Sequence, residues 1–183
     1  MKRILFLALL ITLFSCGGDR SESSSAKAQS ASTAQVVTTP QPPANLTLSV
    51  ANQSIKSGQT SCLDITVADF RSLISMQYSM KWDPAILEFQ EVKGFTLPHL
   101  SAQNFGTHRV QEGILTSVWI DNSLKGQTLS DGAPIFQVCL KAVGNAGQTS
   151  TFAFLEQPTP FEVVTVEEKV VSINGVEGMI KVE

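Results

Sequence analysis

The sequence predicts an all-β protein in which residues 45–183 form one two-sheet antiparallel sandwich. Two observations predict this class. Short runs alternate apolar with polar residues, as expected for strands that bury one face, and turn-forming Gly, Asp, Asn and Pro separate the runs. After the first 16 residues, no stretch sustains the 3.6-residue periodicity of a helix. Many short strands over about 139 residues are typical of a sandwich.

Nine strands are expected in this part of the chain. In chain order, they are Leu46–Val50, Ser61–Val67, Ile74–Trp82, Leu87–Val92, Ile114–Ile120, Ile135–Val143, Thr151–Glu156, Glu162–Val166 and Met179–Val182. Turns are expected between them at Ser57-Gly58, Asp83-Pro84, Glu112-Gly113, Asp131-Gly132, Asn145 to Gly147, and Asn174-Gly175. Each strand is therefore bounded by residues that favour a change of chain direction.

Residues 1–15 predict a signal peptide. Lys2 and Arg3 precede an almost unbroken apolar run from Ile4 to Phe14. As a helix this run would span roughly 16 Å, too little for a bilayer core of about 30 Å. A charged start and a short apolar run are typical of a secretory signal. The alternative interpretation is a buried helix of a cytosolic protein.

Leu13-Phe14-Ser15-Cys16, followed by Gly17, resembles the lipobox of bacterial lipoproteins, although Phe14 departs from the residue type usual at that position. The resemblance implies cleavage before Cys16 and attachment of diacylglycerol to its thiol. Because several acyl chains hold a protein stably on a bilayer, we expect a lipid-anchored protein of the bacterial cell envelope, at the outer membrane or cell surface. The alternative is an ordinary secreted protein in which Cys16 is lost or free.

Residues 16–44 comprise the lipidated Cys16 and a linker predicted to be disordered. The linker has no aromatic residue, nine of its 28 positions are Ser or Thr, and three prolines lie near its end. Such a segment cannot bury enough apolar surface to offset the entropy lost on ordering. The sequence therefore predicts a flexible tether that ends where the sandwich begins at residue 45.

Two stretches of the predicted sandwich resemble the cohesin family. The first, ISMQYSMKWDPAILEF at residues 74–89, contains an alternating strand, an aromatic-Asp-Pro corner and a following strand. The second comprises Ile114–Asp121 and Leu129–Phe136, which are similar to that family's next strand pair and turn. The resemblance covers essentially all of residues 45–183 and implies a nine-stranded antiparallel jelly-roll sandwich. In the corner, Asp83 before Pro84 is expected to cap the turn through backbone N–H groups.

Cys62 and Cys139 remain besides Cys16, and an even pair in an exported chain suggests a disulfide. Strand alternation turns both cysteines away from the predicted core. Two outward thiols can bond only across neighbouring strands of one sheet. The cohesin resemblance implies that these two strands are neighbours, and the alternative is two partly exposed free thiols.

No motif predicts an enzyme or a cofactor. The nucleophile elbow of hydrolases, the HExxH zinc motif, the P-loop and the GxGxxG fingerprint are all absent from the sequence. His99 and His108 lie in the long segment 93–113 without acidic residues or Cys at metal-ligand spacing, so we interpret them as solvated. Without Lys2 and Arg3, 11 basic residues face 16 acidic ones, spread along the chain, so no nucleic-acid partner is expected.

Strand alternation also separates the two tryptophans. Trp82 shares a strand face with Met80 and is expected in the core. Trp119 lies in a strand that is apolar on both faces, so its side is ambiguous, and we interpret it as a candidate binding residue. The full set of partner-binding candidates is Ser75, Gln77, Ser79, Lys81 and Trp119.

The cohesin resemblance implies a non-catalytic, surface-anchored recognition module that binds a dockerin-type protein partner in assemblies that gather polysaccharide-degrading enzymes. We expect a monomer whose partner contacts the face built by residues 74–81 and 114–120. One alternative is a carbohydrate-binding module in which Trp119 and the 93–113 loop bind a polysaccharide, and another is a structural adhesion spacer. An exposed aromatic row would favour a sugar, whereas a flat face that mixes apolar and polar groups would favour a protein.

Overall fold

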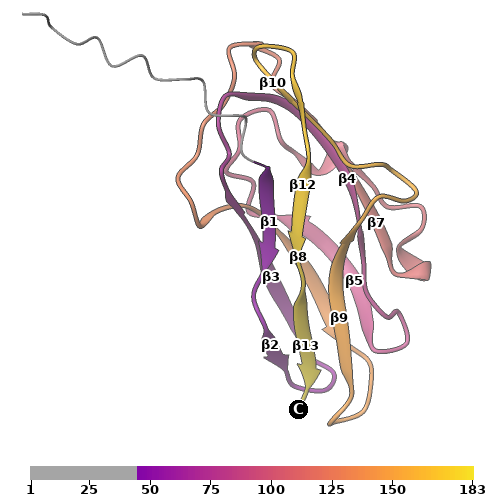
Figure 1. The fold of residues 1–183 in the computed structure, drawn as a ribbon. Helices are drawn as coiled ribbons and strands as arrows, with labels where there is room; N and C mark the ends of the chain where they lie inside the picture. Colours follow the sequence, from indigo (N-terminus) through magenta and orange to yellow (C-terminus); the bar gives the residue numbers. More distant parts are fainter. Residues whose placement is uncertain (1–44) are drawn as a thin grey trace, which may run out of the picture. The chain divides into compact units, whose positions relative to one another are not determined.

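The computed structural model describes residues 45–183, which fold as a β-sandwich with two short 3₁₀ turns (Figure 1). The predicted signal peptide, Cys16 and the linker lie outside the described residues. The turns are Ala102–Asn104 and Val110–Glu112. The strands are β1 Leu46–Val50, β2 Gln53–Ile55, β3 Thr60–Ala68, β4 Leu73–Lys81, β5 Leu87–Lys93, β6 Phe105–Gly106, β7 Ile114–Ile120, β8 Ala133–Ala142, β9 Thr149–Leu155, β10 Glu162–Thr165, β11 Val170–Val171, β12 Ile173–Val176 and β13 Gly178–Val182.

The strands form two sheets. The five-stranded sheet has the order β12-β1-β3-β8-β5. The eight-stranded sheet has the order β11-β10-β4-β9-β13-β2, with β7 pairing to β4 and β6 pairing to β7. Most neighbours are antiparallel, but β1 runs parallel to β12 and β2 runs parallel to β13.

The predicted class is confirmed, and each of the nine predicted strands forms within two residues of its expected bounds. Four further strands, β2, β6, β11 and β12, bring the number in residues 45–183 to 13. They have two to four residues each. Such segments are too short to show a clear alternation, and they extend existing sheets without changing the architecture.

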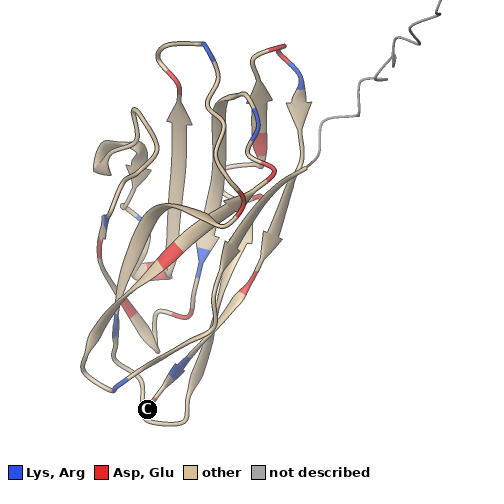
Figure 2. Ribbon diagram, turned by 90° about the vertical axis from the view of Figure 1, so that its left-hand side faces the viewer, with Lys and Arg blue, Asp and Glu red and all other residues tan. Residues whose placement is uncertain are grey.

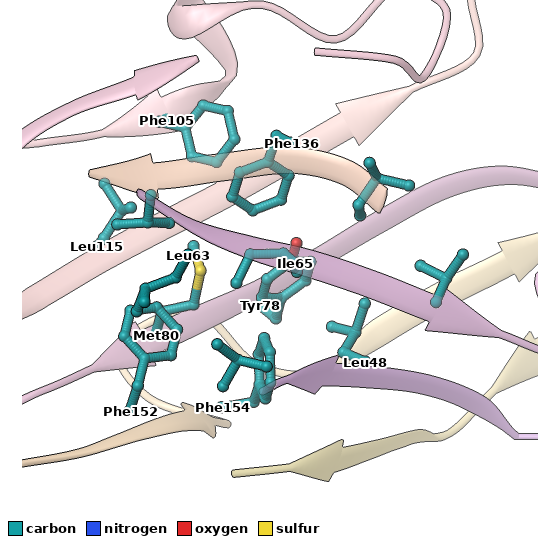
Figure 3. Close-up of a cluster of buried hydrophobic side chains, with 14 of the residues drawn as sticks. Leu48, Leu63, Ile65, Tyr78, Met80, Phe105, Leu115, Phe136, Phe152 and Phe154 are labelled. Carbon is teal, nitrogen blue, oxygen red and sulfur yellow. The ribbon is translucent and has the colours of Figure 1, made fainter. Parts of the chain in front are cut away.

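A single hydrophobic core fills the space between the sheets. Its largest fully buried side chains include Trp82, Trp119, Tyr78 and Phe136. Aromatic rings meet at edge-to-face and stacked geometries; the centroids of Phe105 and Phe136, for example, lie 4.8 Å apart (Figure 3). The prediction that Trp82 belongs to the core is confirmed, since it is 1% exposed.

A disulfide joins β3 to β8. Cys62 and Cys139 lie directly opposite each other in the antiparallel ladder, and their Cα atoms are 3.9 Å apart. Leu63 and Ile65 of β3 point into the core, so the bond lies on the outer side of the five-stranded sheet. The pairing that the family resemblance implied is therefore the one observed.

The Asp83-Pro84 corner connects β4 to β5. The Asp83 carboxylate accepts a hydrogen bond from the backbone N–H of Ala85 at 2.9 Å. The backbone carbonyl oxygen of Asp83 accepts hydrogen bonds from the N–H groups of Ile86 and Leu87. This is the capping role expected of Asp before Pro. Trp82 Nε1 also donates a hydrogen bond to the Leu87 carbonyl oxygen, and this bond fixes the corner to the core.

Candidate protein-binding face

The outer face of the eight-stranded sheet is built around β4 and β7. Along β4, buried Met76, Tyr78 and Met80 alternate with side chains that point away from the core. The register pairs the outward residues of β4 with those of β7. These pairs are Ser75 with Ile120, Gln77 with Val118, Ser79 with Thr116 and Lys81 with Ile114. We call the eight residues of these four pairs the β4–β7 face.

This face mixes apolar with polar groups. Val118 is 43% exposed and Ile120 is 50% exposed, unusually high for large aliphatic side chains on a sheet. Leu155 and Val164, from the neighbouring strands β9 and β10, are half-buried on the same side. None of the large hydrophobic side chains that are exposed in residues 45–183 is aromatic.

Trp119 does not lie on this face, and the expectation that it is a binding residue is corrected. The side chain is 0% exposed and points inward beside Leu115. Its ring packs 5.8 Å from that of Phe70, and its Nε1 donates a hydrogen bond to the Pro98 carbonyl at 2.7 Å. The physical reason is register: Trp119 lies opposite Met76 in the ladder, so both must point into the core.

Ser79 points outward as predicted, but it is not available to a partner. Its side chain is 0% exposed because the segment 156–161, which bulges out between β9 and β10, covers it. Ser79 Oγ donates to the Thr159 carbonyl at 3.1 Å and accepts from the Thr159 N–H at 2.9 Å. Ser75 and Gln77 are half-buried, and Lys81 is exposed. The polar part of the face is therefore smaller than the sequence predicts.

Two hollows border β7. The first hollow has a volume of about 520 Å³ and lies toward Val118 and Ile120, with walls from the segment 99–106. The second hollow has a volume of about 280 Å³ and lies toward Ile114 and Lys81. Its remaining lining residues are Arg109, Leu155, Gln157 and Pro158. The face is thus uneven, with a depression near each end of β7.

Acidic and basic residues are spread over strands and loops (Figure 2). Glu167, Glu168 and Lys169 form a consecutive charged run between β10 and β11. Arg109 donates to both carboxylate oxygens of Glu112, at 3.1 Å from its Nε. This hydrogen bond raises the pKa of Arg109 and lowers that of Glu112. Lys81 forms no ion pair within 4 Å among residues 45–183, but its charge also helps to lower the pKa of Glu112.

The buried carboxylate of Asp121 holds the turn that follows β7. Asp121 accepts hydrogen bonds from Ser123, from the Gly126 N–H and from Gln127, and His99 Nε2 lies 3.6 Å from its Oδ1. Burial by itself raises the pKa of Asp121, but these hydrogen bonds outweigh it and hold the pKa below its usual value of 3.8. These hydrogen bonds therefore favour the charged form of the carboxylate in the folded protein.

We expect Asp121→Asn to lower the melting temperature at pH 7. The folded-state pKa is depressed, so the carboxylate stabilises the fold above its unfolded-state pKa, and that contribution is lost as pH falls through the folded-state value. Melting temperatures of both proteins between pH 7 and pH 2 should therefore converge in acid. Glu177→Gln, at an exposed position, is the matched control, and a constant difference across the pH range would contradict the prediction.

Neither metal ligation nor a membrane-spanning helix is evident in the described part of the chain. No group of three or more His, Cys, Asp or Glu side chains there is placed to hold a metal ion. The helical turns of residues 45–183 are not long or apolar enough to cross a bilayer. His99 and His108 are exposed residues of the loop between β5 and β7.

Comparison with known proteins gives one family and one fold. The family model described as cohesin domain matches residues 46–182 of this chain. A search of curated protein sequences gives no match.

Several solved structures with a similar fold are cohesin domains. The sixth cohesin of scaffoldin B from Acetivibrio cellulolyticus, solved in complex with a dockerin, is 13% identical with a TM-score of 0.64, covering 76% of this chain and 100% of that chain. A Clostridium thermocellum cohesin of OlpA, also solved with a dockerin, is 11% identical with a TM-score of 0.62, over 76% and 100% of the two chains. A non-cellulosomal cohesin from the archaeon Archaeoglobus fulgidus is 14% identical with a TM-score of 0.60, over 76% and 92%.

Proposed function

The chain belongs to the cohesin domain family, and on this premise we propose that it is a non-catalytic recognition module that binds a dockerin-type protein through its β4–β7 face. The observation that carries the proposal is the chemistry of this face. Val118 and Ile120 expose aliphatic surface next to polar groups, and no large aromatic side chain is exposed in residues 45–183. Such a mixture is typical of protein-binding surfaces.

The carbohydrate-binding alternative loses its main residue. It required Trp119 as a stacking platform, and that side chain is enclosed in the core. The spacer alternative gives no reason for two large aliphatic side chains to remain exposed side by side on a sheet. The role in gathering polysaccharide-degrading enzymes and the monomeric state are parts of the same proposal, and the family membership supports them.

We expect Val118→Asp to weaken binding of a dockerin domain at least about 30-fold, because a carboxylate in the centre of an apolar contact must be desolvated without a partner. Titration calorimetry with purified dockerins encoded in the same genome would measure this. Val143→Asp is a matched control, since Val143 is 44% exposed and lies outside the β4–β7 face, beyond the end of β8. Equal loss in both variants, or pelleting of the wild type with insoluble polysaccharide but no dockerin binding, would contradict the proposal.

We further propose that residues 1–15 direct export, that Cys16 carries the lipid and that the following linker tethers the domain to the bacterial envelope. The supporting evidence is the charged start, the short apolar run and the lipobox-like residues. Cys16→Ser should abolish incorporation of an alkyne-labelled fatty acid and move the protein from the detergent phase to the aqueous phase. Ser15→Ala, which keeps a small residue before the thiol, is the control. Unchanged labelling of the Cys16 variant would place the lipid on another residue, and absence of labelling in the wild type would exclude a lipid.

A further inference from the structure

We infer that residues 156–160 are an insertion in a strand of the eight-stranded sheet, and that this insertion determines partner specificity by excluding partners that need access to the middle of β4. The inference rests on the proposed function, because it specifies which partners the β4–β7 face accepts. It also assigns a role to the contact between Ser79 and Thr159, which is to hold the insertion in place.

The strand register shows that β9 and β10 are two parts of one strand beside β4. Leu155, the last residue of β9, lies opposite Ser79, and Glu162, the first residue of β10, lies opposite Gln77. In an uninterrupted antiparallel strand, two positions along β4 would correspond to two positions along its partner. Here two positions along β4 correspond to seven along the partner, so five residues are extra.

Phe161 marks the end of the extra residues. In β10 the buried Val163 points into the core, and two-residue alternation places Phe161 on the same side. Phe161 is partly buried and packs against the core. It therefore takes the inward position that an uninterrupted strand would have between Leu155 and Glu162, and the extra residues are 156–160. We call these five residues the insertion.

Two hydrogen bonds and two prolines fix the insertion over β4. Ser79 Oγ donates to the Thr159 carbonyl at 3.1 Å and accepts from the Thr159 N–H at 2.9 Å, so one hydroxyl binds both backbone groups of one residue. Pro158 and Pro160 lie on either side of Thr159. Because proline has a fixed φ, these residues lose less conformational entropy on ordering than other residues would. The insertion is therefore a rigid part of the surface.

A rigid insertion restricts the partners that can contact the face. It covers Ser79 completely, and Gln157 and Pro158 form part of the wall of the second hollow. A partner that must lie flat across β4 would collide with these residues, whereas a partner that contacts only the uncovered part of the face would not. Specificity arises from such steric exclusion as well as from attraction. The insertion therefore selects partners that leave the middle of β4 free.

The first experiment deletes residues 156–160 from the full chain, which joins Leu155 to Phe161 and restores the register of an uninterrupted strand. Calorimetry measures the affinities of the wild type and the deletion variant for the purified dockerins encoded in the same genome. We expect at least one dockerin that binds the wild type weakly or not at all to gain about tenfold or more in affinity, while the best wild-type partner changes less than about threefold. Circular dichroism and the melting temperature show whether the variant is folded.

The affinity ranking of the dockerins decides the outcome. If the folded deletion variant keeps the ranking of the wild type, the inference is wrong while the proposed function stands. If the variant loses the wild-type partner, the insertion is a contact surface and not a means of exclusion, which also overturns the inference. If no dockerin binds either protein, the proposed function fails and the inference fails with it.

The second experiment releases the insertion without shortening the chain. Ser79→Ala removes both hydrogen bonds, so the Thr159 amide should exchange with solvent at least about tenfold faster, measured by nuclear magnetic resonance. The dockerins that gain affinity from the deletion should also gain affinity from Ser79→Ala. Thr159→Ala is the matched control, because both bonds involve the Thr159 backbone and persist in that variant.

Two results of the second experiment would overturn the inference. Equal amide exchange in the wild type and in Ser79→Ala would show that the hydroxyl does not hold the insertion. Faster exchange with unchanged affinities for all dockerins would show that the position of the insertion does not select partners.

Discussion

Trp119→Ala should destabilise the domain by about 3–5 kcal/mol, the range found when a large core aromatic side chain is removed. The side chain is fully buried, packs against Phe70, and its Nε1 donates to the Pro98 carbonyl. The substitution leaves a cavity between the sheets and an unpaired carbonyl oxygen in the loop that follows β5. Urea unfolding followed by circular dichroism would measure the loss.

Two controls separate packing from other effects. Trp119→Phe keeps an aromatic ring but removes the hydrogen bond, so about 1–2 kcal/mol should be lost. Val118→Ala, at the neighbouring outward position, should cost less than about 1 kcal/mol because Val118 is 43% exposed. A Trp119→Ala protein that is as stable as the wild type but fails to bind polysaccharide would restore the carbohydrate-binding interpretation.

Removal of the disulfide should cost a similar amount. The bond between Cys62 and Cys139 spans 77 positions of sequence, and closing a loop of that length stabilises a fold by about 4 kcal/mol, mainly by restricting the unfolded chain. The double variant Cys62→Ala with Cys139→Ala should therefore melt at a clearly lower temperature. Calorimetry with and without a reducing agent would measure the difference.

Reduction separates the effect of losing the disulfide bond from the effect of replacing the two cysteine side chains. The reduced wild type should melt close to the double alanine variant, and the reducing agent should not affect that variant. If reduction leaves the melting temperature of the wild type unchanged, the two thiols are not bonded in the folded protein. A single Cys62→Ala variant would leave Cys139, which is 1% exposed, as a buried thiol with little reactivity.

Much of the fold could be predicted because several of its strands, namely β1, β7, β9 and β13, follow the two-residue period over five or more positions. In β1, for example, buried and half-buried residues alternate without exception. Strands such as β11, with two residues, have no period to detect. The parallel pairing of β1 with β12 could not be predicted from the sequence either, because it depends on which distant segments meet and not on any local pattern.

The binding face was predicted less completely, for two physical reasons. In β7 both faces are apolar, so alternation alone could not decide whether Trp119 or Val118 points inward; the pairing with β4 decides it. For Ser79, alternation gave the correct side but could not show that Thr159 covers it, because that contact comes from 80 positions away. Which segment covers an outward-pointing residue depends on tertiary contacts, and strand alternation does not show these.

The position of β1 determines how the domain would carry mechanical load. The first strand of the sandwich, β1, lies between two hydrogen-bonded neighbours, β12 and β3. Tension applied at Leu46 and resisted at the far end of β1 would act along the strand and shear both ladders together, instead of opening their hydrogen bonds one by one. A terminal strand at a sheet edge would peel away under a smaller force. A protein that retains a partner against fluid flow would gain from this arrangement, since its fold would withstand tension along the chain.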